Sequence, residues 1–282
     1  MNLLDQILNL AALLLWLSWR SARLLPRTKS SALSLASTLK KAEPHTPIRV
    51  FYLCSLMGLL IIRSVAYWHL GQRVNWTPAL NLVAITLPFR SDHFFLMLFY
   101  SWLSFGLVLA LFYAWLLLIS VVNRTVPDSE PLQKLLRLHL GWLERWPWAI
   151  KLSLPMVSAF LAWCSLNPIF VKLGMIPSPL SHVHLLQQAA VLGLSSVLCW
   201  KILLLSVLLL HLLNSYVYLS NSSLLSFAST TARNLLRALD WLPLRAGRLD
   251  FSPVAGVALV LFTAKWATYW LPKLYLRLPF GF

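Results

Sequence analysis

"HFFLMLFYSWLSFGLVLALFYAWLLLISVV", residues 93–122, is a long apolar run without Asp, Glu, Lys or Arg. A helix needs about 20 mostly apolar residues to cross a bilayer, so this run predicts a transmembrane helix. The whole chain has 282 residues, of which 59% are hydrophobic and 11% charged, and its mean hydropathy is +0.72. This composition excludes an ordinary soluble domain. Five further runs have the length of a span: 2–19, 50–70, 152–171, 184–219 and 252–271.

These runs predict an all-α, polytopic membrane protein with about six transmembrane helices. Residues 2–19 are the weakest span, because they contain Asp5, Gln6 and Asn9. This segment either crosses the membrane or lies at its interface. It is not an ordinary signal peptide, since basic residues follow it instead of preceding it, and this order points to an N-terminus outside the cytoplasm.

The 24 Lys and Arg residues, against eight Asp and Glu, are distributed unevenly between the spans. Sixteen fall in three alternate loops, 20–49, 123–151 and 220–251, and five lie on the opposite side. The positive-inside bias therefore predicts that these loops are cytoplasmic and that both termini lie outside. Anionic lipid headgroups explain the positive charge better than nucleic acid does, so we expect lipid contact and no nucleic-acid partner.

An internal repeat gives the chain its organisation. "LLRLHLGWLERWPWAIKLSLPMVSAFLAW" from Leu135 resembles "LLRALDWLPLRAGRLDFSPVAGVALVLF" from Leu235. Each copy follows a span that ends near an asparagine, and each contains a proline that we expect to open the next span. These asparagines are Asn123 and Asn221, and the prolines are Pro155 and Pro253. The repeat predicts an N-terminal extension at 1–90, a first hairpin repeat at 91–172 and a second at 173–282.

Two further features of the repeat leave alternatives open. Residues 31–53 are either a third, degenerate copy or a flexible linker. Each complete copy also contains a basic amphipathic segment, with Leu132, Leu135, Leu136, Leu143 and Trp146 as the apolar positions of the first and Leu235, Leu236, Leu239 and Leu242 as those of the second. These segments either lie in the cytoplasmic headgroup layer or connect and pack on the spans. The cations expected to face lipid are Lys134, Arg137, Arg145, Arg233 and Arg237.

The run Asp250-Phe251-Ser252-Pro253, placed after a basic amphipathic segment and before a span, resembles a motif of the YggT (YlmG) family of integral membrane proteins. The resemblance is best over about 184–271, is weaker over 93–171, and does not cover 1–90. The first copy keeps only Ser153 and Pro155 of the motif. The resemblance implies an inner-membrane protein without enzymatic activity, such as an accessory or assembly factor.

Elementary physics explains the same run as a helix start. Proline suits the first turn of a helix, Ser252 is placed to cap the free amides, and Asp250 would sit at the positive end of the helix dipole. We find no Gly-x-Ser-x-Gly motif and no His at triad or metal spacing. The sequence therefore predicts no catalytic residues, no metal site and no cofactor.

Polar residues inside the spans are the better functional candidates, because charge in a bilayer is costly. They are Arg63, Asn167, Lys201 and Lys265. Asp5 and Asp92 are the acids placed to pair with Arg63. Asn167 and Lys265 each follow the proline of their repeat by 12 residues, which predicts a shared feature at one depth. The lysines either snorkel and pack, or contact a ligand or partner subunit.

These observations favour an accessory, scaffold or assembly-factor subunit of a larger membrane complex, with anionic lipids and other integral membrane subunits as partners. Leu-rich and Trp-rich spans offer lateral surface to partner helices and poor walls for an aqueous path. The alternative is a small-solute or ion transporter or channel that uses the intramembrane cations. The two complete repeats start on the same side of the membrane, which favours transport less than inverted repeats would.

Overall fold

The computed structural model describes residues 2–24, 46–74, 76–124, 131–216, 222–239, 241, 245–246 and 249–279. The chain divides into two compact units. Unit 1 comprises residues 1–78 and 89–109, and unit 2 comprises residues 79–88 and 110–282. Asn221 and residues 31–45 of the proposed third repeat lie outside the described part, as do Asp240 and Leu242.

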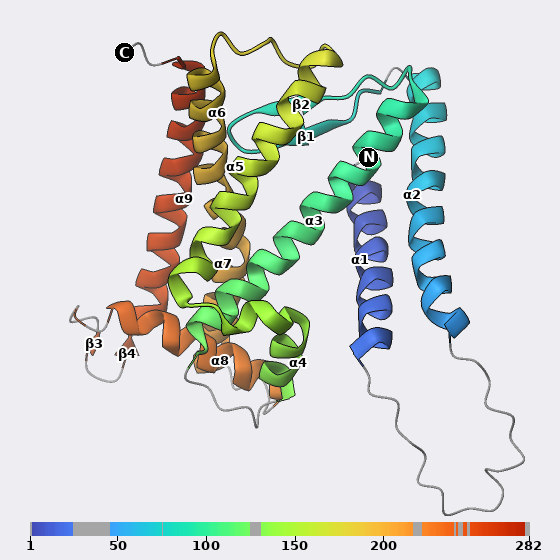
Figure 1. The fold of residues 1–282 in the computed structure, drawn as a ribbon. Helices are drawn as coiled ribbons and strands as arrows, with labels where there is room; N and C mark the ends of the chain where they lie inside the picture. Colours follow the sequence, from blue (N-terminus) through green and yellow to red (C-terminus); the bar gives the residue numbers. More distant parts are fainter. Residues whose placement is uncertain are drawn as a thin grey trace, which may run out of the picture. The chain divides into compact units, whose positions relative to one another are not determined.

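The described residues are almost entirely helical, which confirms the predicted all-α class (Figure 1). The α-helices are α1 (Asn2–Leu24), α2 (Thr46–Val74), α3 (Phe94–Val122), α4 (Pro131–Leu140), α5 (Trp148–Lys172), α6 (His182–Ser195), α7 (Trp200–Tyr216), α8 (Ser223–Leu236) and α9 (Ser252–Leu276). Short 3₁₀ helices are η2 (Gly141–Arg145), η3 (Ser196–Cys199) and η4 (Arg237–Leu239). Two antiparallel ribbons pair β1 (Ala79–Asn81) with β2 (Thr86–Pro88), and β3 (Arg245–Ala246) with β4 (Leu249–Asp250).

Five of the six predicted spans form helices that are long and apolar enough to cross a membrane. By length and composition these are Val50–Arg73, Phe94–Val122, Trp148–Lys172, His182–Ser215 and Ser252–Leu276. The remaining run, 2–19, forms most of α1, a helix of 23 residues. Among the described residues, α1 does not meet the criteria of length and apolar composition that the other five helices meet. The chain is therefore compatible with a multi-pass membrane protein.

In unit 1, α1 and α2 lie antiparallel and side by side (Figure 1). Their common core consists of Ala12, Leu56 and Leu60 together with Phe105 of α3. Asp5, one turn from the start of α1, lies beside Arg63 in the second half of α2. Because contacts run from this end down to Ala12, α1 follows α2 lengthwise and does not cross it at one point.

Unit 2 is built on the antiparallel pair α5 and α6, and on α7, against which α8 and α9 pack. The predicted run 184–219 is one candidate span that changes to a 3₁₀ helix at η3 before α7 begins. Two tryptophans bond the backbone there: Trp115 donates to the Cys199 carbonyl at 2.8 Å, and Trp200 donates to the Ala114 carbonyl at 3.1 Å. In a bilayer such bonds matter because water is not present to satisfy carbonyls at an irregular turn.

The helix start predicted at Pro155 is wrong. Helix α5 begins at Trp148, Pro147 is its N-cap residue, and Pro155 lies inside the helix. Ser153 is likewise internal, since its hydroxyl donates to the Ile150 carbonyl at 3.1 Å. Pro147 takes the starting role because the residue before a helix adopts an extended conformation, which proline tolerates. Ser153 and Pro155 therefore do not mark a helix start.

The second copy keeps this function in part. Pro253 lies at the start of α9, as predicted, and it is buried. The N-cap residue is Phe251, not Ser252, and no side-chain hydrogen bond caps the helix. In the β3–β4 ribbon immediately before α9, Asp250 lies opposite Arg245 as its backbone partner across the two strands. The predicted N-cap position is therefore corrected by one residue, from Ser252 to Phe251.

The contact between α5 and α6 is close enough to require glycine. A Cβ atom on Gly193 would lie 2.9 Å from the Met156 carbonyl oxygen, whereas a Cβ on Gly58 of α2 would meet no atom within 4 Å. We expect Gly193→Ala to lower the free energy of unfolding by about 1–3 kcal/mol, because backbone has to move.

The matched control Gly58→Ala should be neutral or stabilising by up to about 1 kcal/mol, because alanine favours the helix. Unfolding in detergent–SDS mixtures measures both variants. Equal effects of the two substitutions would contradict the close packing of α5 on α6.

Candidate functional site

The most deeply buried charge among the described residues is Arg63, of which 2% is exposed. Its guanidinium donates to the Asn9 side-chain oxygen at 2.7 Å and to the Ser104 hydroxyl at 3.0 Å. It also forms an ion pair with the carboxylate of Asp5. One arginine thereby joins α1, α2 and α3 within unit 1.

Two tyrosines complete this cluster. The Tyr67 hydroxyl donates to Asp5 at 2.8 Å, and the Asn9 amide donates to Ser104 at 3.0 Å. The guanidinium carbon of Arg63 lies 5.3 Å from the ring centre of Tyr67 and 5.8 Å from that of Tyr100. Such cation–π contacts stabilise a desolvated cation. In this arrangement the side chain of Arg63 on α2 is bonded to residues of α1 and α3, so it links the three helices.

Sequence analysis named Asp5 and Asp92 as possible partners of Arg63, and the structure gives Asp5. Asp92 instead lies 3.9 Å from Arg90 in an exposed pair. The other members of the cluster were missed. A signal was present, because each helix supplies two polar or aromatic residues four positions apart: Asp5 and Asn9, Arg63 and Tyr67, Tyr100 and Ser104. Residues four apart share a helix face, so three such pairs indicate facing surfaces.

A second charged cluster lies in unit 2 where α3 ends and α5 begins. Lys151, only 6% exposed, donates to the Ser120 hydroxyl at 2.8 Å and pairs with Glu144 at 3.2 Å. Arg137 lies 3.6 Å from the other oxygen of Glu144. The expectation that Arg137 faces lipid freely is therefore corrected, since it is half-buried in an ion pair. The other four cations predicted to face lipid are exposed: Lys134, Arg145, Arg233 and Arg237.

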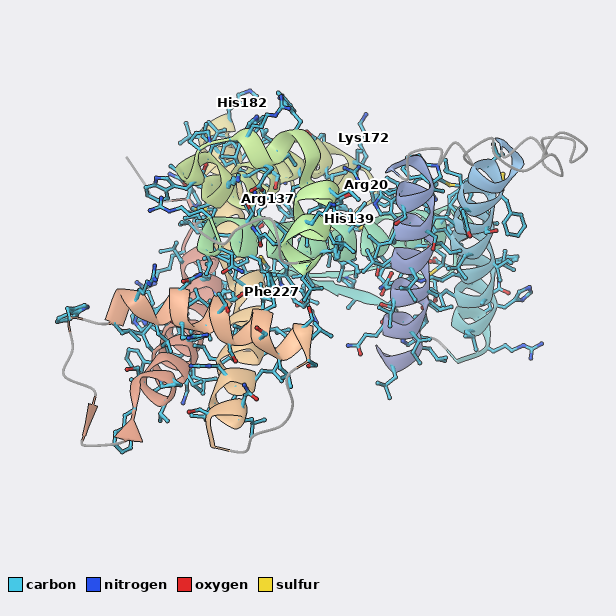
Figure 2. All side chains as sticks on the ribbon, turned by 90° about the horizontal axis from the view of Figure 1, so that it is seen from below. Arg20, Arg137, His139, Lys172, His182 and Phe227 are labelled. Carbon is cyan, nitrogen blue, oxygen red and sulfur yellow. The ribbon has the colours of Figure 1, made fainter. Side chains whose placement is uncertain are left out.

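Helices α4 and α8 meet at Asn123, the residue that ends the first repeat's long span. The Asn123 amide donates to the Thr231 hydroxyl at 2.7 Å and accepts from Asn234 at 3.1 Å. Gln133 of α4, fully buried, donates to the Asn123 carbonyl at 3.4 Å. Seen from below in Figure 2, α4, which carries Arg137 and His139, and α8, which carries Phe227, lie at the same end of unit 2. The amphipathic segments thus pack on the spans and still expose cations.

The residues of α4 that are buried are not all those of the predicted apolar face. Leu136 and Leu140 pack against Leu117 as apolar periodicity predicts. Leu135, however, is 54% exposed, while the polar Gln133 is fully buried. Gln133 is buried because its side-chain amide donates to the Asn123 carbonyl, and a leucine side chain has no donor for that carbonyl.

The other polar residues predicted within spans are not brought together. Asn167 is buried in α5, Lys201 is half-buried in α7, and Lys265 is exposed on α9. Equal spacing after Pro155 and Pro253 therefore does not create a shared internal feature. Among the described residues, no hydrogen bond or ion pair is found for Lys201 or Lys265. No group of three or more His, Cys, Asp or Glu side chains in the described ranges is placed to hold a metal ion.

The face of α9 around Lys265 is apolar and open. The exposed large residues on it include Leu261, Phe262, Trp266 and Tyr269. Positions 261, 262 and 269 lie four before, three before and four after Lys265, so they share its side of the helix. Only Pro253, Gly256 and Ala264 of α9 are buried in unit 2. This surface, Leu261–Tyr269, is called the α9 face below.

The Arg63 cluster makes a prediction about stability. Asp5→Asn should lower the free energy of unfolding by about 3 kcal/mol or more, because Arg63 then stays buried without a counter-charge. The double variant Asp5→Leu with Arg63→Met should recover most of this loss, since no unpaired charge remains.

Asp92→Asn is the matched control, because it removes an exposed ion pair and should change stability by less than about 1 kcal/mol. Denaturation in mixed micelles, followed by circular dichroism, measures all three. If Asp5→Asn costs no more than Asp92→Asn, the cluster does not stabilise unit 1.

The chain matches no protein-family model, no curated protein and no solved structure. The resemblance of Asp250-Phe251-Ser252-Pro253 to the YggT family therefore stays a prediction based on those residues.

Proposed function

We propose that the chain is a non-enzymatic integral protein of the bacterial inner membrane that acts as an accessory, scaffold or assembly-factor subunit of a larger membrane complex. The observation that carries this proposal is Lys265, which is exposed near the middle of an apolar transmembrane helix. The family resemblance adds support, because it implies a protein without enzymatic activity.

Lys265 lies too deep to reach water easily. It follows the start of the 25-residue helix α9 by 13 residues, a distance of about 20 Å along the helix axis. The hydrocarbon core is about 30 Å thick, so a lysine side chain reaches only part of the way to the headgroups. A charge at this depth is usually paired within a protein assembly. A carboxylate on a neighbouring subunit's helix is the partner that fits this position.

The α9 face gives such a partner a surface to pack on. Phe262 is 72% exposed and Trp266 is 60% exposed, and they flank Lys265. Aromatic residues around a desolvated charge pair are typical of the residues that dominate interface energies. The polar contact would select the partner, and the aromatic contacts would supply most of the buried area.

The orientation proposed for the chain follows from unit 1. Since α1 lies lengthwise against α2 and pairs with Arg63, we propose that it crosses the membrane with α2. Six spans then place both termini outside the cytoplasm. The helix ends that carry α4 and α8, with Lys134, Arg145 and Arg233, would face the cytoplasm.

The proposal predicts that Lys265→Leu releases the partner subunits. After solubilisation of native membranes in a mild detergent, we expect their recovery with the full chain to fall at least about tenfold, since about 1.4 kcal/mol changes an equilibrium tenfold. Lys265→Arg should keep most of the recovery. Lys172→Leu is the control, because Lys172 is an exposed lysine in the last turn of α5, outside the α9 face.

A specific partner should contain an Asp or Glu inside one of its spans, and neutralising that acid should reproduce the loss. Unchanged recovery with Lys265→Leu would contradict the proposal. A chain that purifies alone, transports solute in liposomes, and loses transport in Lys265→Leu would instead support the transporter alternative.

A further inference from the structure

Unit 2 contains an open groove with a volume of about 440 Å³ at the end where α3 finishes and α5 begins. Helix α8 and η4 close its other side. The lining residues are Val121, Val122, Arg124, Trp148, Leu152, Asn234 and Arg237. This set is called the headgroup groove below.

The lining has two chemically distinct parts. Arg124 and Arg237 are both exposed and supply two guanidinium groups, and Asn234 adds an amide. Val121, Val122, Trp148 and Leu152 form an apolar wall, and none of the described lining residues is acidic. Arginine forms paired hydrogen bonds to phosphate oxygens, so the polar part suits a phosphate.

The groove lies at the level where the candidate spans end. Val122 is the last residue of one span and Trp148 is the first of another. Tryptophan is enriched at this level of a bilayer, between acyl chains and headgroups. Helix α5 also begins at Trp148 without a side-chain cap, so the positive end of its dipole adds to the attraction for an anion.

We propose that the headgroup groove binds one anionic phospholipid. Its phosphate lies between Arg124 and Arg237, and its glycerol and upper acyl chain lie on Val121, Val122 and Leu152. A phospholipid fits better than a soluble phosphate ion, because a phosphate ion would leave the apolar wall in contact with water. The inference requires that unit 2 spans a membrane, but it does not require a partner at Lys265.

Titration of the full-length protein in detergent with phosphatidylglycerol, followed by native mass spectrometry, tests this site. The double variant Arg124→Gln with Arg237→Gln should weaken binding of the first lipid by about tenfold or more, because charge-assisted bonds are lost. Arg145→Gln with Arg233→Gln is the matched control. Both control residues are exposed and lie outside the groove lining, and the change in net charge is the same. We expect less than a twofold effect from it.

Three outcomes would overturn the inference. Equal weakening in both double variants would indicate a diffuse charge effect, and equal binding of phosphatidylcholine would remove the preference for an anion. Full displacement of phosphatidylglycerol by millimolar inorganic phosphate would indicate a phosphate-ion site instead. Recovery of partner subunits through Lys265 should be unchanged in the groove variant, so failure here is distinguishable from failure of the proposed function. Unfolding in mixed micelles, followed by circular dichroism, checks independently that the groove variant folds.

Discussion

A positive charge buried in an apolar helix bundle needs a partner, and this constraint explains the two charged clusters of the described residues. Arg63 is paired within unit 1, where Asp5, Asn9 and Ser104 surround its guanidinium. Lys151 is paired within unit 2, where its ammonium group forms an ion pair with Glu144 and donates a hydrogen bond to the Ser120 hydroxyl. Lys265 differs from both, because no partner is found for it in the described chain. Lys201, half-buried in α7, also has no hydrogen bond or ion pair among the described residues. The partner proposed above for Lys265 lies on another molecule.

Pairing also explains why hydropathy undervalues α1. Asp5 and Asn9 lower the mean hydropathy of this helix, yet both face Arg63 and Ser104 instead of lipid. In the paired state the ion pair has no net charge, and the remaining surface of α1 is largely apolar, with Leu3, Ile7, Leu10 and Leu14 exposed. A helix whose polar residues are satisfied by its neighbour can enter a bilayer although its own sequence argues against it.

The sequence predicted the helical class and the positions of most spans, because apolar runs of about 20 residues have few other structures available. It also limited the partner of Arg63 to two acids. It did not predict that α5 starts at Trp148, directly after Pro147, and not at Pro155, since either proline suits a helix start. The burial of Gln133 and the exposure of Leu135 were also unpredictable, because they depend on the distant Asn123 carbonyl. Equal spacing after a proline gave Asn167 and Lys265 matching sequence positions only, since Asn167 is buried in α5 and Lys265 is exposed on α9.

The layer formed by α4 and α8 follows the same logic as the long apolar helices. Asn123, Gln133, Thr231 and Asn234 satisfy one another, so α4 and α8 are fixed to the end of α3 by neutral hydrogen bonds. Glu144 holds Lys151 and Arg137, which removes two cations from the surface. The cations that remain exposed, Arg124 and Arg237 among them, are therefore the ones that internal pairing does not use. The proposed lipid site uses the exposed arginines beside the apolar wall of the headgroup groove. The α9 face proposed for a partner helix consists of other residues, so the two proposals use different surfaces.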